Sequence, residues 1–164
     1  MKFLHLVATG LVACTLLSCA KSPTGRSQLL MFDQKQVDSM GLQSFSDLKA
    51  KSKINKDKKL NQYVQCVANQ IIKATPAKYQ LNPWEIVVFE DDQVNAFALP
   101  GGKIGVYTGL LLVADNQHQL AAVIGHEVGH VMAEHANERL SSSTAVEGIM
   151  NVADVALTAM NTRY

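Results

Sequence analysis

Cysteine is scarce in this chain, with three among 164 residues. Two of them, Cys14 and Cys19, lie in or beside the apolar N-terminus, which leaves Cys66 alone in the rest of the sequence. Small secreted domains that depend on disulfides need several cysteine pairs, so the sequence excludes a disulfide scaffold. We expect Cys66, which lies in a helical pattern, to be a small packing residue. The alternative is a disulfide between two molecules in an oxidising compartment.

An excess of charge of either sign is also absent. The formal charge is +1, from 15 basic and 14 acidic residues, so there is no basic surplus to attract a phosphate backbone. We therefore expect no nucleic-acid partner. The sequence contains no internal repeat, and its 48% of hydrophobic residues is sufficient for the core of one modest globular domain.

No hydrophobic run is long enough to cross a membrane. The most apolar stretch, residues 3–17, follows Lys2 and is shorter than the roughly 20 residues of a membrane span, as is typical of a signal-peptide core. It ends in Leu-Leu-Ser-Cys at Cys19, which resembles a bacterial lipobox, whose cysteine begins the mature protein and carries lipid. We expect a lipoprotein signal peptide over residues 1–18 and a lipidated tether over residues 19–32, with an ordinary secretory signal as the alternative. The resemblance implies an outer-membrane location facing the periplasm.

The most informative motif is His-Glu-Val-Gly-His at residues 126–130. Residues four apart lie on the same face of a helix, so His126 and His130 can bind one Zn²⁺ at about 2.0–2.1 Å each. Glu127 lies beside the metal, where it can take a proton from an activated water and pass it to a leaving amine. The motif therefore predicts a metallopeptidase site, with one Zn²⁺ per chain.

The sequence around this motif supports a helix. Asn116 can cap its start, with Gln119 as the second half of a capping box. Apolar residues follow at helical spacing, and no proline interrupts residues 117–140. We expect this helix to end at the polar residues 141–144 and a last helix to follow over residues 145–160.

The remaining pattern predicts an α+β fold. We expect N-terminal helices over residues 33–51 and 60–71, then a small antiparallel sheet, a short helix and the helix that carries the motif. The expected strands and short helix cover residues 83–90, 94–99, 104–107 and 108–113.

The predicted hairpin before the motif is the second candidate site. Peptidases that cut unfolded chains commonly hold them extended, and an exposed edge strand can do so through main-chain hydrogen bonds. We expect Asn95, Ala96, Phe97 and Ala98 to form such a substrate-binding edge. The alternative is an ordinary hairpin with Phe97 in the core.

Four stretches together resemble metallopeptidase family forty-eight, which includes the prenyl-protein peptidases and the membrane heat-shock peptidases. They are Thr-Gly-Arg-Ser-Gln-Leu at residues 24–29, Val-Asn-Ala-Phe-Ala-Leu-Pro-Gly-Gly at 94–102, Tyr-Thr-Gly-Leu at 107–110, and residues 126–135. The chain is most similar to the soluble periplasmic lipoprotein members. The resemblance implies a gluzincin-like zincin domain and zinc-dependent cleavage of unfolded or misfolded envelope proteins.

One part of the family pattern is missing. The family takes its third zinc ligand from a Glu-x-x-x-Asp motif on a later helix, and the 34 residues after His130 do not contain it. Glu134 would lie about 12 Å along the helix from His126, too far to complete the site. Glu147 remains an alternative if the chain folds back after residues 141–144. We therefore expect residues 33–164 to be the N-terminal part of a longer, C-terminally truncated peptidase domain.

Two functions follow from the sequence. The first is an active zinc endopeptidase of the cell envelope, anchored to the membrane by lipid. The second is a catalytically inactive lipoprotein that binds partners or unfolded chains. We expect His118 and His135 to lie on the surface, although His135 recurs in the family after the second ligand.

Overall fold

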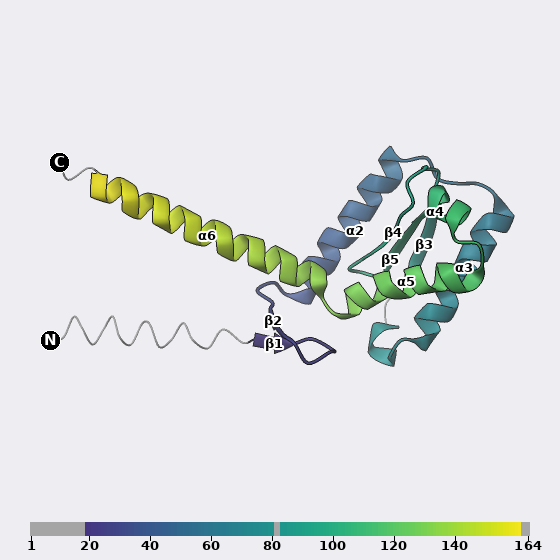
Figure 1. The fold of residues 1–164 in the computed structure, drawn as a ribbon, viewed down its shortest axis with the longest axis horizontal. Coiled ribbons are helices and arrows are strands. Elements are labelled where there is room, and N and C mark those ends of the chain that lie inside the picture. Colours follow the sequence, from purple (N-terminus) through teal and green to yellow (C-terminus); the bar gives the residue numbers. More distant parts are fainter. Residues whose placement is uncertain (1–18, 81–82, 162–164) are drawn as a thin grey trace.

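The computed structural model describes residues 19–80 and 83–161 (Figure 1). The predicted signal peptide lies outside these residues. Within the described chain, runs of strands and runs of helices follow one another as separate groups, which confirms the α+β class. In chain order the elements are β1 (Cys19–Lys21), β2 (Ser27–Leu29), α2 (Gln34–Lys51), α3 (Lys58–Ala74), the 3₁₀ helix η2 (Ala77–Tyr79), β3 (Glu85–Phe89), β4 (Ala96–Leu99), β5 (Lys103–Tyr107), α4 (Thr108–Val113), α5 (Gln117–Met132) and α6 (His135–Asn161).

The central sheet has three strands in the order β3-β5-β4. β4 and β5 form the predicted antiparallel hairpin, in which Gly101 and Gly102 adopt φ values of 81° and 73° that favour glycine. β3 pairs with β5 in parallel, so the sheet is mixed and not wholly antiparallel as the sequence suggested. The reason is that β5 turns back from β4 and occupies the middle of the sheet, where it lies beside β3 and runs in the same direction.

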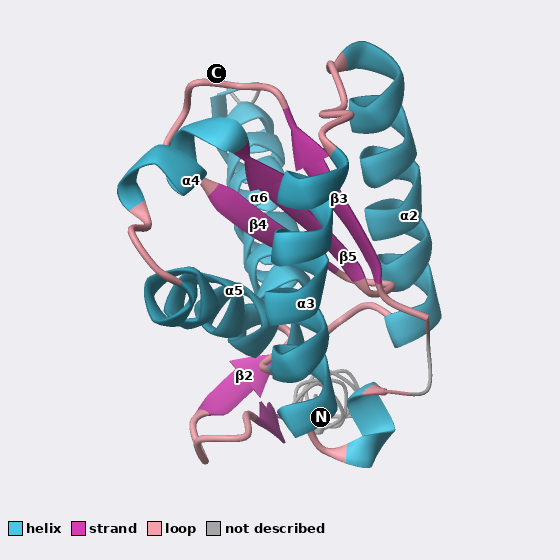
Figure 2. Cartoon of the chain, turned by 90° about the vertical axis from the view of Figure 1, so that its right-hand side faces the viewer, coloured by secondary structure: helices cyan, strands magenta, loops and turns pink. Residues whose placement is uncertain are grey.

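Helices cover both faces of this sheet (Figure 2). Because side chains alternate along a strand, one face carries aromatic rings and the other carries small and branched residues. Phe89 and Phe97 pack against Phe45 of α2 on the first face, with ring centroids 6.1 and 6.3 Å from that of Phe45. The second face packs against α3 and α5, and its buried members are Val88, Ala96, Ile104 and Val106.

Two helices begin directly after residues whose side chains cap them: α5 after Asn116, as predicted, and α3 after Asp57, with its first residue two positions before the expected start. The Asn116 side chain accepts hydrogen bonds from the backbone N–H groups of His118 and Gln119 at the start of α5. The Gln119 side chain bonds back to the N–H of Asp115, one residue before the position that a capping box uses. Asp57 caps α3 in the same way.

The predicted end of the motif helix is wrong. α5 stops at Met132 and α6 begins at His135, because Glu134 adopts a left-handed backbone with φ of 53°. Residues 141–144 do not break the helix. The hydroxyl groups of Ser143 and Thr144 bond back to the carbonyl of Leu140, which lets α6 continue through them.

This corner changes the position of the acidic residues that follow the motif. Glu134 lies at the corner itself, and Glu138 lies on α6 and not on the motif helix. Glu147 is twelve residues beyond the start of α6, or about 18 Å along a continuous helix. It does not fold back toward the two histidines. α6 extends away from the rest of the domain (Figure 1).

The segment expected to be a tether contains a β-hairpin. β1 and β2 pair antiparallel, and the strand residue Gln28 is 3% exposed. The hairpin contacts α6 through several side chains, described below. Cys66 is exposed, so its predicted packing role is wrong. None of the described helices combines the length and the hydropathy of a membrane span.

Candidate metal centre

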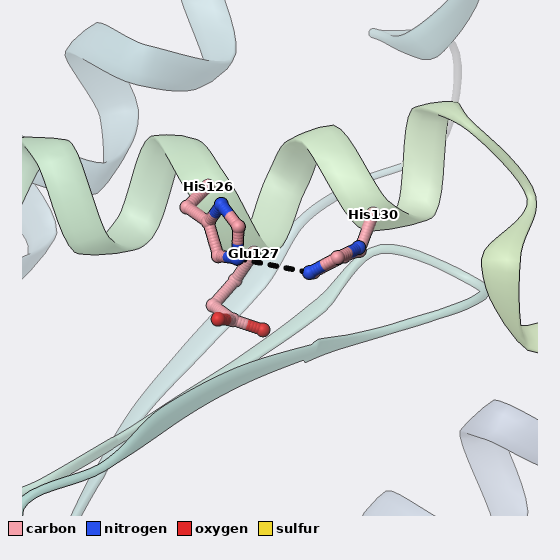
Figure 3. A group of neighbouring side chains, drawn as sticks. All are labelled: His126, Glu127 and His130. Carbon is pink, nitrogen blue, oxygen red and sulfur yellow. Dashed lines mark hydrogen bonds between the residues drawn. The ribbon is translucent and has the colours of Figure 1, made fainter.

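Helix α5 presents His126, Glu127 and His130 together (Figure 3). The Nε2 atoms of the two histidines are 3.0 Å apart, and their ring centroids are 4.4 Å apart. One ligand atom from each of the three side chains falls within a group whose members all lie within 4.8 Å of one another. His126 is exposed, whereas Glu127 and His130 are half-buried, so the group is open to solvent on one side.

The spacing of the two imidazoles fits a divalent metal ion. Two bonds of about 2.0–2.1 Å at a tetrahedral angle place the two nitrogens about 3.3 Å apart. The observed separation of 3.0 Å is within a few tenths of an ångström of that value. Both rings turn the same type of nitrogen inward, as ligands of one ion would. Neutral imidazole is a common ligand for zinc and for neighbouring transition metals.

The opposite face of α5 fixes the direction of this group. Leu120, Ile124 and Val128 are at most 1% exposed and pack in the core formed with α3 and the sheet. Ala96 and Ala98 of β4 contribute small side chains to the same core, which lets the helix lie close to this strand. With one face buried there, the histidines and Glu127 project from the side that remains accessible.

His135, expected on the surface, is half-buried and contacts the second histidine of the motif. Its Nδ1 atom is 2.5 Å from Nδ1 of His130, and its ring is half-buried. Burial lowers the pKa of His135, with the neighbouring His130 as a further cause, which favours a neutral ring. On one continuous helix, residues five apart would point about 140° away from each other. The left-handed backbone at Glu134 brings the two rings together, and no local sequence signal predicts that corner.

The end of α5 is held by side chains from distant parts of the chain. The hydroxyl of Tyr79 donates to the carbonyl of Met132 at 3.0 Å, and Gln28 Nε2 donates to the carbonyl of Ala133 at 2.6 Å. Such carbonyl groups in the last turn of a helix lack partners within the helix. Gln28 belongs to the stretch at residues 24–29 that resembles the family, whereas no sequence pattern points to Tyr79.

Helix α6 makes a second contact with the hairpin. Arg26 binds Glu138 with two hydrogen bonds of 2.5 and 2.6 Å. Gln28 also donates to Glu138, at 3.1 Å. These bonds, first those from Arg26 and then that from Gln28, lower the pKa of Glu138 to about 2. Glu138 is therefore an ionised partner of the hairpin.

Strand β4 lies at the edge of the described sheet, with β5 on one side. The backbone carbonyl of Asn95 accepts from Tyr107 N–H. Two residues later, Phe97 is opposite Gly105 and likewise turns its backbone groups toward β5. In an antiparallel pair, the residues between such positions turn their N–H and C=O groups outward. Ala96 and Ala98 therefore present backbone donors and acceptors at the free edge.

The side chain of Phe97 has a different role. Its ring lies over Gly105 of β5, where a Cβ atom would be 2.1 Å from the ring. It also packs against Phe45 and Phe89. The two interpretations of residues 95–98 are thus compatible, because this side chain belongs to the core while the backbone of its neighbours is available at the edge.

Among the described residues, His126, Glu127 and His130 form the one group of three or more ligand-type side chains close enough to share an ion. Glu134, Glu138 and Glu147 do not belong to it. The structure therefore brings together the three predicted motif residues, and none of the acidic side chains described on α6 joins them.

Comparisons with known proteins agree with this geometry. The model of Peptidase family M48 matches residues 58–163. The mitochondrial metalloendopeptidase OMA1 of Arabidopsis thaliana is 41% identical over 85 residues, which cover 51% of this chain and 18% of that protein. The beta-barrel assembly-enhancing protease of Yersinia pestis is 30% identical over 112 residues, covering 68% of this chain and 22% of that protein. The chain thus spans about a fifth of the length of these curated relatives.

The ionised state of Glu138 gives a testable pH dependence. Its pKa is about 2 in the folded chain against an ordinary value of 4.5, so the unfolded chain takes up the proton first as the pH falls. The stabilisation is complete above pH 4.5 and is lost as the pH falls toward 2. We expect the free energy of unfolding to decrease more steeply between pH 5 and pH 2.5 in the wild type than in Glu138→Gln. Urea denaturation at several pH values measures this free energy. The same pH dependence in the two proteins would contradict the assignment.

Proposed function

Because the chain belongs to peptidase family M48, we propose that it carries the catalytic metal site of a zinc-dependent endopeptidase of the bacterial cell envelope. The observation that supports this most directly is the 3.0 Å separation of the His126 and His130 Nε2 atoms, with the Glu127 carboxylate beside them. The family and the donor set imply a divalent metal. We propose that it is one Zn²⁺ per chain.

Each residue of the group has a distinct task in this proposal. His126 and His130 hold the metal through Nε2. A bound Zn²⁺ supplies Lewis acidity, which makes a water molecule more acidic and polarises a peptide carbonyl. The Glu127 carboxylate accepts the proton from the attacking water and then delivers it to the nitrogen of the leaving amine. Glu127 follows the first ligand directly, so it lies near the metal site but does not share the helical face of the two histidines.

Catalytic zinc sites typically have three protein ligands and one open position. The two histidines supply two of them. We propose that the third comes from a residue outside the described part of the chain, because α6 carries its acidic residues away from the site. Without such a ligand, the protein would have the alternative function of a catalytically inactive lipoprotein that binds partners or unfolded chains.

We propose that the substrate binds as an added strand along β4. Asn95, Ala96, Phe97 and Ala98 form this edge, and the outward N–H and C=O groups belong to Ala96 and Ala98. Main-chain hydrogen bonds do not depend on side-chain identity. This mode of binding therefore suits unfolded or misfolded proteins, whose backbones are accessible.

The proposed location depends on the N-terminus. The lipobox-like sequence that ends at Cys19 supports lipid attachment, outer-membrane sorting and a position facing the periplasm. Similarity to a bacterial protein named for beta-barrel assembly supports the same compartment. Unfolded or misfolded envelope proteins would be the substrates there.

The role of Glu127 can be separated from metal binding. We expect Glu127→Gln to lower kcat/KM for an unfolded protein substrate by about 10²-fold or more, since it removes the general base. Its zinc content should stay close to that of the wild type, because both imidazoles remain. His130→Ala should lose metal and activity together. Near-normal turnover in Glu127→Gln would show that another group takes the proton.

The edge-strand proposal predicts a backbone effect at Ala98. Replacing this residue by proline removes an outward N–H group but no bond of the β4–β5 ladder. We expect Ala98→Pro to raise KM about 2- to 10-fold, since one hydrogen bond contributes about 0.5–1.5 kcal/mol, with kcat less affected. Ala98→Ser keeps the N–H group and serves as the matched control. An unchanged KM in a folded Ala98→Pro protein would exclude binding at this edge.

Lipidation can be tested on the mature protein. We expect mass spectrometry of protein from bacterial membranes to show Cys19 as the first residue, with acyl chains attached. Two or more such chains give stable membrane anchoring. Cys19→Ala should then be released from the membrane fraction. A mature chain that begins elsewhere, or that carries an unmodified Cys19, would contradict the prediction.

A further inference from the structure

We propose that the N-terminal hairpin, residues 19–29, is a positioning element of the metal site, because it fixes the α5–α6 corner that places His135 on His130. The corner consists of Ala133 and Glu134. The inference rests on the proposed metal site and extends it to residues more than 100 positions earlier in the chain. Three structural steps connect the hairpin to the ligand.

The first step is a preorganised turn in the hairpin. The backbone N–H of Ser22 donates to the carbonyl of Arg26 at 2.8 Å, and the N–H of Gly25 donates to the carbonyl of Ser22 at 2.8 Å. The Ser22 hydroxyl accepts from Arg26 N–H and lies 2.9 Å from the hydroxyl of Thr24. These bonds fix the backbone from which the Arg26 side chain extends.

The second step joins this hairpin to both sides of the corner. Gln28 donates to the carbonyl of Ala133, the last group before the left-handed residue, and to the carboxylate of Glu138 in the first turn of α6. Arg26 holds the same carboxylate with a two-bond contact. One amide side chain therefore spans the change of direction, and its orientation is set by partners on both helices.

The same junction continues along α6. Asn137 donates to the carbonyl of Phe32 at 2.8 Å, and Ser141 accepts from the N–H of Met31 at 2.8 Å. Within the described chain, the buried polar side chains all belong to this junction: Ser22, Gln28, Asn137 and Ser141. A satisfied polar network defines one relative orientation of its parts more sharply than apolar packing does. The junction is thus suited to fixing an angle between helices.

The third step is the contact between the two rings. A histidine that binds metal through Nε2 carries its proton on Nδ1, and that proton normally has a fixed acceptor. His130 Nδ1 lies 2.5 Å from His135 Nδ1. With a metal on its Nε2, His130 would donate from Nδ1, and His135 would accept with its own proton on Nε2. The contact fixes both the tautomer and the plane of the ligand.

His130 needs this support more than His126 does. It lies two residues before the end of α5, in the last turn, where backbone carbonyls lack helical partners. His126 lies a full turn earlier, inside the hydrogen-bonded helix. A ligand in a turn that can fray loses its geometry first, so outside contacts at the corner act mainly on His130.

The test measures metal binding, with no need for catalysis. Zn²⁺ affinity of the full-length protein is determined by competition with a chelator, and the visible absorption of Co²⁺ in the same site reports ligand geometry. We expect His135→Ala to weaken Zn²⁺ binding about 10- to 100-fold, as for other partners of metal-binding histidines, and to change the Co²⁺ spectrum. His135→Asn keeps a polar atom near the position of Nδ1 and should recover part of the affinity.

The hairpin is tested in the same assay. Gln28→Ala and Arg26→Ala should weaken Zn²⁺ binding in the same direction by smaller factors. Gln28 is buried, so Gln28→Ala could fail to fold. Arg26 is exposed and its substitution leaves no cavity, so Arg26→Ala tests the hairpin in that case. The matched controls are Ser27→Ala, an exposed residue of the same hairpin, and His118→Ala, an exposed histidine at the start of α5. Both should bind Zn²⁺ as the wild type does.

The outcomes separate this inference from the proposed function. A wild-type protein that binds no Zn²⁺ would overturn both. A wild type that binds Zn²⁺, together with a His135→Ala protein of equal affinity and unchanged Co²⁺ spectrum, would overturn the positioning role alone. A weakened His135→Ala protein beside unaffected Gln28→Ala and Arg26→Ala proteins would show that the hairpin does not act on the site.

Discussion

The left-handed backbone at Glu134 is the constraint on which the surroundings of the candidate site depend. It ends α5 two residues after His130 and sends α6 in a new direction. Without it the helix would continue and His135 would point away from the ligand. Such a conformation is unfavourable for a residue with a side chain, and no glycine relieves it. The surrounding contacts from Tyr79 and Gln28 to the preceding carbonyls therefore stabilise the corner.

The direction of α5 has a different physical cause from the corner at its end. Its direction is set by hydrophobic burial, since Leu120, Ile124 and Val128 pack in the core shared with α3 and the sheet. Alanine at positions 96 and 98 lets the helix lie close to β4, while the larger Phe97 turns to the opposite face. The motif helix lies beside the strand edge because Ala96 and Ala98 pack toward α5, whereas Phe97, between them, packs toward α2.

The two ends of α5 explain how much of the structure the sequence predicts. The start of α5 follows from its capping residue Asn116, and the helix α2 follows from apolar residues at helical spacing, which are signals that act over a few positions. The residue types of the metal group follow from their spacing on one helix. The corner does not, because the groups that stabilise it lie about 50 and 100 residues earlier. The parallel pairing of β3 with β5 likewise depends on which strand returns to the middle of the sheet, and periodicity alone does not determine that.

The two proposed ligands of the motif therefore differ in the contacts that hold them in place. Helical geometry alone brings two imidazoles four residues apart to the same face. It does not hold them equally, because His126 lies inside the helix and His130 lies in its last turn. The polar junction between the hairpin and α6 lies next to the last turn of α5, and its buried side chains are all hydrogen-bonded. The stretch at residues 24–29 and the motif at residues 126–130 are far apart in the chain, yet they meet through the corner and His135. The proposed metal site therefore includes the contacts that hold the end of this helix as well as the five-residue motif.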